Sequence, residues 1–281
     1  MAAIDDQAAT SWQVMGRGPR KALAIHCSLA HSGAWAGVAR ALDAHLTVTA
    51  FDLPGHGGSA PWAGTGEIQA ASTAMAAALL DGPADILGHS FGATVALRLA
   101  VEHPRLVRSL CLHEPVFFAV ALADRPEMRA AHVAEMADYR AGIAAGDMAR
   151  AARGFLKVWG DGEGWEALPE ATRARIAAQM PLIEAAAPAL YEDAGGMLAS
   201  GALGRIGAPV LLMQGARSPA IIDAINAGLA ARLPLCRRAT IAGAGHMAPI
   251  TRPQAVAAEI AGFLGLRTGS GTPRDHSLER R

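Results

Sequence analysis

Cysteine and aromatic residues are both scarce in this chain of 281 residues. The three cysteines, Cys27, Cys111 and Cys236, lie far apart and are odd in number, which argues against a disulfide framework and favours a reducing compartment. No Cys-x-x-Cys pair occurs, so we expect no structural zinc site. Aromatic residues make up only 5% of the chain, too few for a surface on which nucleic-acid bases stack.

An excess of charge of one sign is also missing, because Lys+Arg and Asp+Glu number 25 each. The chain therefore has no electrostatic footprint for nucleic acid or for an anionic membrane. No run approaches the roughly 20 apolar residues of a membrane helix, and residues 1–10 lack the basic start of a signal peptide. The sequence predicts a cytoplasmic protein that acts on a small molecule and binds neither nucleic acid nor membrane.

Hydrophobic residues make up 52% of the chain, and they alternate between strand-like and helix-like segments. Strands separated by single helices predict a parallel sheet with helices on both faces. This alternation of strands and helices stops between about residues 115 and 207, where helical segments occur without a convincing strand. Residues 267–281 are polar and basic, which predicts a disordered tail. The expected strands cover residues 12–15, 22–26, 46–51, 84–87, 106–112, 209–213 and 238–241.

Residues Gly88-His89-Ser90-Phe91-Gly92 form a Gly-x-Ser-x-Gly pattern between an apolar strand and an Ala-rich helix. A serine at such a sharp turn is held in a strained conformation that lifts its hydroxyl toward a substrate. The two glycines avoid clashes with the neighbouring elements, and the helix N-terminus directs N–H groups to the same place. The pattern alone is common in a chain with 31 glycines, but its position between strand and helix favours Ser90 as a nucleophile.

Two other segments suggest different chemistry and are rejected. Residues 55–60 match Gly-x-Gly-x-x-Ala after a strand, but a dinucleotide site needs a helix to begin within the glycine turn, and here the next helix begins late. Cys27 could be a nucleophile, but a small buried thiol is far commoner.

Five segments occur in the order typical of one family: the loop at His26, the loop at Asp52, the turn at Ser90, Glu114-Pro115, and Gly245-His246. From about residue 11 to 265 the chain thereby resembles the α/β-hydrolase superfamily. The resemblance implies an α/β fold: a mostly parallel eight-stranded sheet with helices on both faces, and a helical cap inserted after the sixth strand. It implies a core of residues 1–114 and 208–266, a cap of residues 115–207, and a tail of residues 267–281.

The resemblance also implies roles for individual residues. His246 takes the place of the catalytic histidine, and the backbone N–H groups of Ser28 and Phe91 take the places of the oxyanion donors. No cofactor and no metal is implied. The family usually carries glycine where this chain has Cys27, so the oxyanion loop departs from the common pattern.

The acid of the triad has two candidates. The family's common pattern places an aspartate after the strand at 209–213, but this chain has Ser218 there, and a hydroxyl cannot supply a negative charge. Glu114 ends the strand before it, and neighbouring parallel strands lie about 4.8 Å apart, so its longer side chain could reach the same imidazole. We assign Glu114, with Asp223 as the alternative.

The expected function is a serine hydrolase that cleaves a small to medium apolar ester, lactone or thioester through an acyl-enzyme. The same triad would also serve a C–C bond hydrolase or a cofactor-free perhydrolase. A ligand-binding receptor with little turnover is the alternative from another class, because the chain departs from the family at Cys27 and Ser218.

Overall fold

The structure is a computed structural model that describes residues 10–160, 162 and 164–266. Its strands form a seven-stranded sheet in the order β1-β3-β2-β4-β5-β6-β7. β1 runs antiparallel to β3, and all other neighbours pair in parallel. The strands are β1 (Trp12–Met15), β2 (Arg20–Ile25), β3 (Leu46–Phe51), β4 (Ala84–His89), β5 (Val107–His113), β6 (Val210–Gly215) and β7 (Cys236–Ile241). The α/β fold class expected from the sequence is confirmed.

Two details of the expected fold are wrong for the described residues. The sheet has seven strands rather than eight, because β1 pairs directly with β3 and only residues 16–19 separate it from β2. The long helical segment consequently follows the fifth described strand and not the sixth. The expected tail, residues 267–281, lies outside the described residues.

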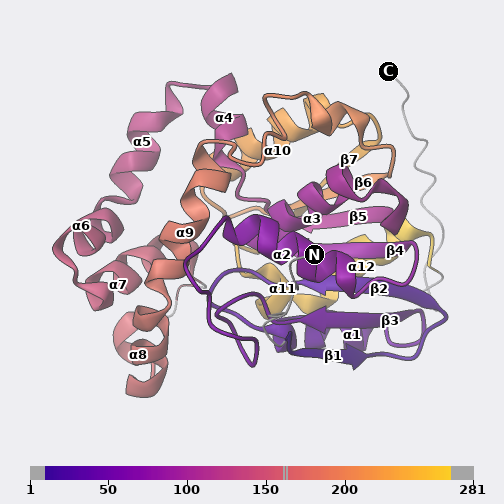
Figure 1. The fold of residues 1–281 in the computed structure, drawn as a ribbon, viewed down its shortest axis with the longest axis horizontal. Helices are drawn as coiled ribbons and strands as arrows, with labels where there is room; N and C mark the ends of the chain where they lie inside the picture. Colours follow the sequence, from indigo (N-terminus) through magenta and orange to yellow (C-terminus); the bar gives the residue numbers. More distant parts are fainter. Residues whose placement is uncertain (1–9, 161, 163, 267–281) are drawn as a thin grey trace, which may run out of the picture.

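Helices cover both faces of the sheet, and each face has its own apolar cluster. Figure 1 shows α2 (Ile68–Ala78) and α3 (Phe91–Glu102) in front of the sheet, and α11 (Ala248–Thr251) and α12 (Pro253–Leu264) behind it. Ile86 of β4 packs in the first cluster, whereas its neighbour Leu87 packs in the second. Successive side chains point to opposite faces, so a strand covered on both sides is apolar throughout. The remaining core helices are α1 (Ala36–Ala41) and α10 (Ala220–Arg232).

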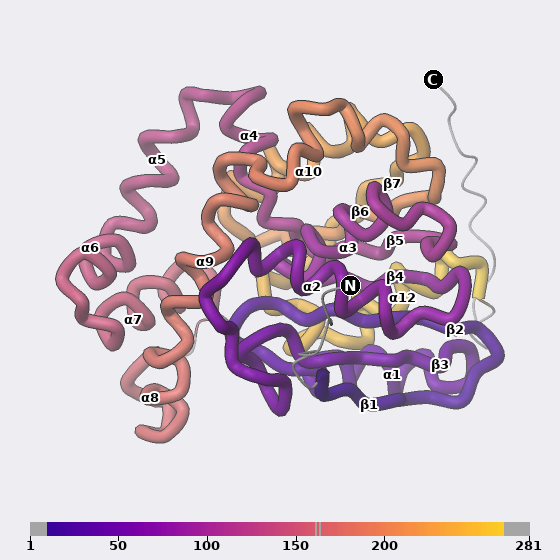
Figure 2. The backbone as a smooth tube through the Cα atoms, viewed as in Figure 1, coloured from indigo at the N-terminus to yellow at the C-terminus, as the bar shows by residue number. Residues whose placement is uncertain are grey.

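The described residues between β5 and β6 form helices and no strand. The tube in Figure 2 leaves the sheet with α4 and returns through α9, so that α5 to α8 lie to one side of the sheet. No helix of the described residues has both the length and the apolar character needed to cross a bilayer. The helices of this segment are α4 (Phe118–Asp124), α5 (Met128–Glu135), α6 (Ala137–Ala145), α7 (Met148–Trp159), α8 (Glu170–Ala178) and α9 (Met180–Tyr191).

Candidate active site

Ser90 occupies the sharp turn between β4 and α3. Its backbone has φ 57° and ψ −119°, a conformation that residues other than glycine rarely adopt. A Cβ at Gly88 would lie 2.6 Å from the Ala93 Cα, and one at Gly92 would lie 2.4 Å from the His26 carbonyl oxygen. Both glycines are therefore required by close backbone contacts, as the pattern predicted. The Ser90 side chain faces a cavity although the residue is only 7% exposed.

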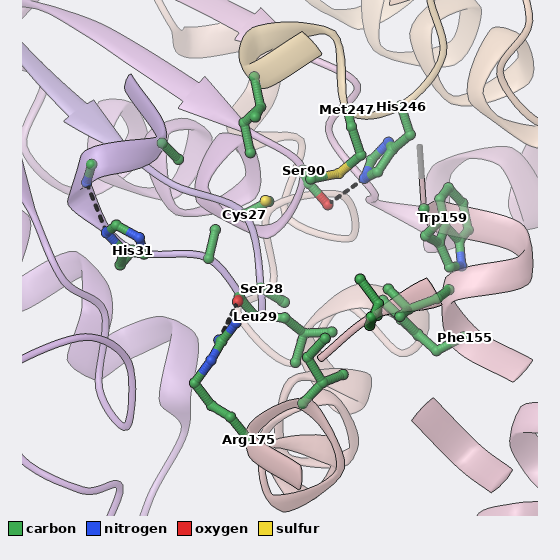
Figure 3. A pocket seen from close by; sticks show the side chains of 18 residues that line it. Cys27, Ser28, Leu29, His31, Ser90, Phe155, Trp159, Arg175, His246 and Met247 are labelled. Carbon is green, nitrogen blue, oxygen red and sulfur yellow. Dashed lines mark hydrogen bonds between the residues drawn. The ribbon is translucent and has the colours of Figure 1, made fainter. Parts of the chain in front are cut away.

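His246 follows β7 and lies between Ser90 and Glu114. Its Nε2 is 3.0 Å from the Ser90 Oγ, and its Nδ1 is 2.7 Å from the Glu114 Oε2. Figure 3 shows the imidazole turned toward the Ser90 hydroxyl. Because the carboxylate can only accept, Nδ1 carries the proton and donates it to Glu114, which leaves Nε2 free to accept from the serine. The imidazole is thus held in the tautomer that a base acting on Ser90 requires.

Glu114 is fully buried at the end of β5, next in space to the end of β6. Its Oε1 accepts hydrogen bonds from the Gly215 N–H at 2.6 Å and from the Ser218 hydroxyl at 2.5 Å. Burial raises the pKa of this carboxyl, but the hydrogen bond from His246, together with the charges and N–H groups nearby, outweighs burial and lowers the pKa to about 2. Glu114 is therefore a carboxylate at neutral pH.

The alternative acid, Asp223, lies away from this cluster. Its side chain is 57% exposed and forms an ion pair with Arg238 at 2.6 Å. The structure therefore brings Ser90, His246 and Glu114 together and leaves Asp223 on the surface. Ser218, in the family's common acid position, donates a hydrogen bond to Glu114.

The loop after β2 brings Ser28 beside Ser90, where both line the same cavity. Two buried histidines hold this loop: His56 Nε2 accepts from the Leu29 N–H at 3.1 Å, and His26 Nδ1 donates to the Cys27 carbonyl at 2.7 Å. Burial lowers the pKa of His26 to about 3, so its ring stays neutral. Among the backbone hydrogen bonds of the described turns and loops, none uses the N–H of Ser28 or Phe91. Of the two residues, Ser28 lines the cavity beside Ser90, and Phe91 follows Ser90 as the first residue of α3.

Two further histidines near the site were missed by the sequence analysis. His89 Nε2 donates to the His246 carbonyl oxygen at 2.9 Å and so ties the histidine loop to the serine turn. The buried His113 places its Nε2 3.4 Å from the Glu114 Oε1. Their only signal in the sequence was their position at the ends of β4 and β5, directly before Ser90 and Glu114. No group of three or more His, Cys, Asp or Glu side chains in the described part of the chain is placed to hold a metal ion.

Ser90 lines two neighbouring cavities. The larger, which we call the entry cavity, has a volume of about 410 Å³, and His246, Met247, Ile250 and Leu168 are among its lining residues (Figure 3). The smaller, the inner cavity, has a volume of about 70 Å³ and extends between α4, α6, α7 and α9. Trp159 lines both, and its ring lies edge-on to the His246 ring at 5.0 Å between centroids. Both cavities are lined mainly by apolar side chains.

Comparison with known proteins identifies the family. The alpha/beta hydrolase family model matches residues 22–259. A "Pimeloyl-[acyl-carrier protein] methyl ester esterase" from Neisseria meningitidis serogroup B is 35% identical over 235 residues, which cover 80% of this chain and 86% of that protein. A protein of the same name from serogroup C is 52% identical over 90 residues, which are only 32% of this chain and 34% of that relative.

A solved structure, a hydrolase from Pseudomonas aeruginosa, superposes with a TM-score of 0.68 at 24% identity and covers 94% of this chain and 97% of that one. At that identity the likeness shows the fold alone. The family match and the long alignment at 35% identity go further. This chain belongs to the alpha/beta hydrolase family.

Proposed function

We propose that the chain is a serine ester hydrolase with Ser90 as nucleophile, His246 as general base and Glu114 as the acid of the triad. The observation that carries the proposal is the continuous hydrogen-bonded chain from Ser90 through His246 to Glu114, at 3.0 Å and 2.7 Å. Family membership and the similarity to esterases make the chain an ester-hydrolysing enzyme, and the triad and its substrate are what we add.

The geometry supports a two-step acyl transfer. His246 Nε2 takes the hydroxyl proton as the Ser90 Oγ attacks the ester carbonyl, and the Glu114 carboxylate stabilises the imidazolium that forms. The N–H groups of Ser28 and Phe91 hold the carbonyl oxygen as it becomes negative. The imidazolium then gives its proton to the leaving oxygen, and the alcohol departs. Water, activated by His246, hydrolyses the acyl-enzyme and restores Ser90.

The apolar lining of both cavities supports a small to medium apolar ester, and a lactone or thioester would react by the same steps. Helices α7 and α9 supply much of that lining, so we assign residues 115–207 as a cap over the core. A closed, apolar site excludes bulk water and strengthens the hydrogen bonds within the triad.

Labelling with a fluorophosphonate probe tests the nucleophile. The unmodified protein should react at Ser90 and hydrolyse p-nitrophenyl acetate, because only an activated serine attacks the probe. The variant Ser90→Ala should lose both labelling and turnover. Ser200→Ala, which changes an exposed serine, is the matched control and should retain both. A ligand-binding receptor would give no labelling of the unmodified protein, and that result would overturn the proposal.

A further inference from the structure

The two cavities do not share the catalytic base. Both are lined by Ser28 and Ser90, so the reacting carbonyl lies beside these two residues, next to both cavities. His246 lines the entry cavity and not the inner one. The two groups on either side of a bound ester carbonyl, which we call its arms, would therefore have different surroundings. One arm would lie beside the imidazole and the other away from it.

Proton transfer decides which arm lies in which cavity. The imidazolium must donate its proton to the leaving oxygen, which therefore has to lie beside His246 Nε2. The alcohol part of the ester then extends into the entry cavity, which His246 lines. The acyl part extends the other way, past Phe118 and Trp159 into the inner cavity.

The inner cavity limits the length of the acyl part. An engineered cavity of about 150 Å³ holds benzene, with its six carbons, so a volume of about 70 Å³ has room for roughly three carbons beyond the carbonyl. The entry cavity, at about 410 Å³, holds a much larger group.

Polar side chains lie between the inner cavity and a further hollow, and three of them, Tyr139, Glu184 and Tyr191, line both. The Tyr139 hydroxyl donates to the Glu184 carboxylate, and the Tyr191 hydroxyl is hydrogen-bonded to His132 Nε2 at 2.8 Å. The further hollow has a volume of about 510 Å³ and is lined in part by Arg129 and Arg140. A longer apolar chain would have to break these hydrogen bonds to pass, which would leave the buried Tyr139 and His132 without these partners, and unpaired buried polar groups are costly.

We propose that the substrate is an ester of a short acyl group, about two to four carbons long, with a larger apolar alcohol. This inference rests on the proposed function and adds the orientation and size limits of the two arms. The acyl group fills the inner cavity up to the hydrogen-bonded pair of Tyr139 and Glu184, and the alcohol lies in the entry cavity.

Two isomeric esters test the orientation, because octyl acetate and methyl nonanoate have the same composition with the arms exchanged. We expect kcat/KM for octyl acetate to exceed that for methyl nonanoate at least about tenfold, since one misplaced methylene in an apolar pocket already costs about tenfold or more. With p-nitrophenyl esters, activity should fall by a similar factor from butyrate to hexanoate. Faster hydrolysis of methyl nonanoate, or a flat chain-length profile, would overturn the inference.

A matched pair of variants tests which cavity limits the length of the acyl group. Ile183→Ala enlarges only the inner cavity, and Leu168→Ala enlarges only the entry cavity; both side chains are half-buried. We expect the hexanoate activity to recover in Ile183→Ala and the acyl-length profile to stay unchanged in Leu168→Ala. Equal profiles in the two variants would contradict the assignment. If fluorophosphonate labels Ser90 but these preferences fail, the inference alone is wrong; if no labelling and no ester hydrolysis occur, the proposed function fails with it.

Discussion

The Glu114 carboxylate accepts hydrogen bonds on both of its oxygens. His246 donates to one oxygen, and Gly215 and Ser218 donate to the other. A buried charge is tolerated when its hydrogen-bonding capacity is used in this way, and it keeps the negative charge that an imidazolium needs. The positive φ of Glu114, 49°, belongs to the same arrangement, because it turns the chain at the end of β5.

Replacement of each candidate acid by its amide tests which of the two belongs to the triad. Glu114→Gln should lower kcat by about 10³–10⁴-fold, because the neutral amide neither stabilises the imidazolium nor selects its tautomer. Asp223→Asn weakens only surface contacts, an ion pair with Arg238 and a hydrogen bond from Gln214, so kcat should change by less than about twofold. Steady-state kinetics with p-nitrophenyl acetate measures both, with circular dichroism to confirm folding. A larger loss in Asp223→Asn would reverse the assignment.

Ser218 offers a second test of the acid. Its hydroxyl lies 2.5 Å from the Glu114 Oε1, so an aspartate there would place a carboxylate in nearly the same space. In the Glu114→Gln background, Ser218→Asp should restore kcat at least about tenfold by returning the negative charge. In the unmodified protein the same substitution should lower stability, because two carboxylates in contact repel. Absence of any recovery would mean that only the end of β5 can hold the acid.

The turn between β4 and α3 is the element on which the site depends. The residues two positions before and after Ser90 have no room for a side chain. Gly88 lies against the start of α3, and Gly92 lies against the backbone at the end of β2. Ser90 is held with a positive φ by its N–H bond to the His113 carbonyl at 2.9 Å and by the first turn of α3. The strain is compensated by the packing of the two elements, which is why a change in the turn should affect stability as well as activity.

Two glycine-to-alanine substitutions in helices test whether close packing at the turn contributes to stability. In Gly92→Ala the new Cβ would meet the Ile25 and His26 carbonyl oxygens at 2.4 Å, so we expect a loss of about 1–3 kcal/mol in the free energy of unfolding. Gly262→Ala in α12 meets nothing within 4 Å, and there alanine should stabilise by about 0.5–1 kcal/mol because it favours the helix. Urea denaturation measures both. Equal changes in the free energy of unfolding would show that the close packing at Gly92 does not affect stability.

Buried histidines set the response of the whole molecule to acid. Burial lowers the pKa of five of them, to about 3 for His26 and to about 4 for His113 and His132. They hold the oxyanion loop, the triad region and the wall of the inner cavity, so their neutral form belongs to the folded site. The five are His26, His56, His89, His113 and His132.

The sign of the pH dependence follows from these shifts. Below about pH 6.5 the unfolded chain protonates these histidines while the folded protein does not, so the free energy of unfolding should decrease as the pH falls from about 6.5 to 4. Glu114, whose folded pKa is lowered, adds stability above pH 4.5 that is lost between 4.5 and about 2. Denaturation at a series of pH values measures the slope. His113→Gln should reduce the proton uptake on unfolding by up to one, and an unchanged slope would contradict the prediction.

Features that depend on near neighbours in the chain could be predicted from the residues alone. The spacing of Gly88, Ser90 and Gly92 between an apolar strand and a helix specifies the serine turn within five residues. The apolar strands and the order of the motifs were enough for the fold class, because strands covered on both faces show no alternation. The expected number of eight strands was wrong because it was taken from the family, whereas the described N-terminal segment contains one strand, β1, before β2.

The distances between side chains of the site depend on the folded arrangement of distant segments. Ser90 and His246 are 156 residues apart, and Glu114 and His246 are 132 apart, so their distances depend on the order of the strands in the sheet. The sequence left Glu114 and Asp223 as alternatives because they follow neighbouring strands. In the fold Glu114 lies directly after β5 and reaches His246, whereas Asp223 lies in α10 and pairs with Arg238 on the surface. The His89 bond and the division of the cavity also arise from contacts between distant segments, which residue spacing does not encode.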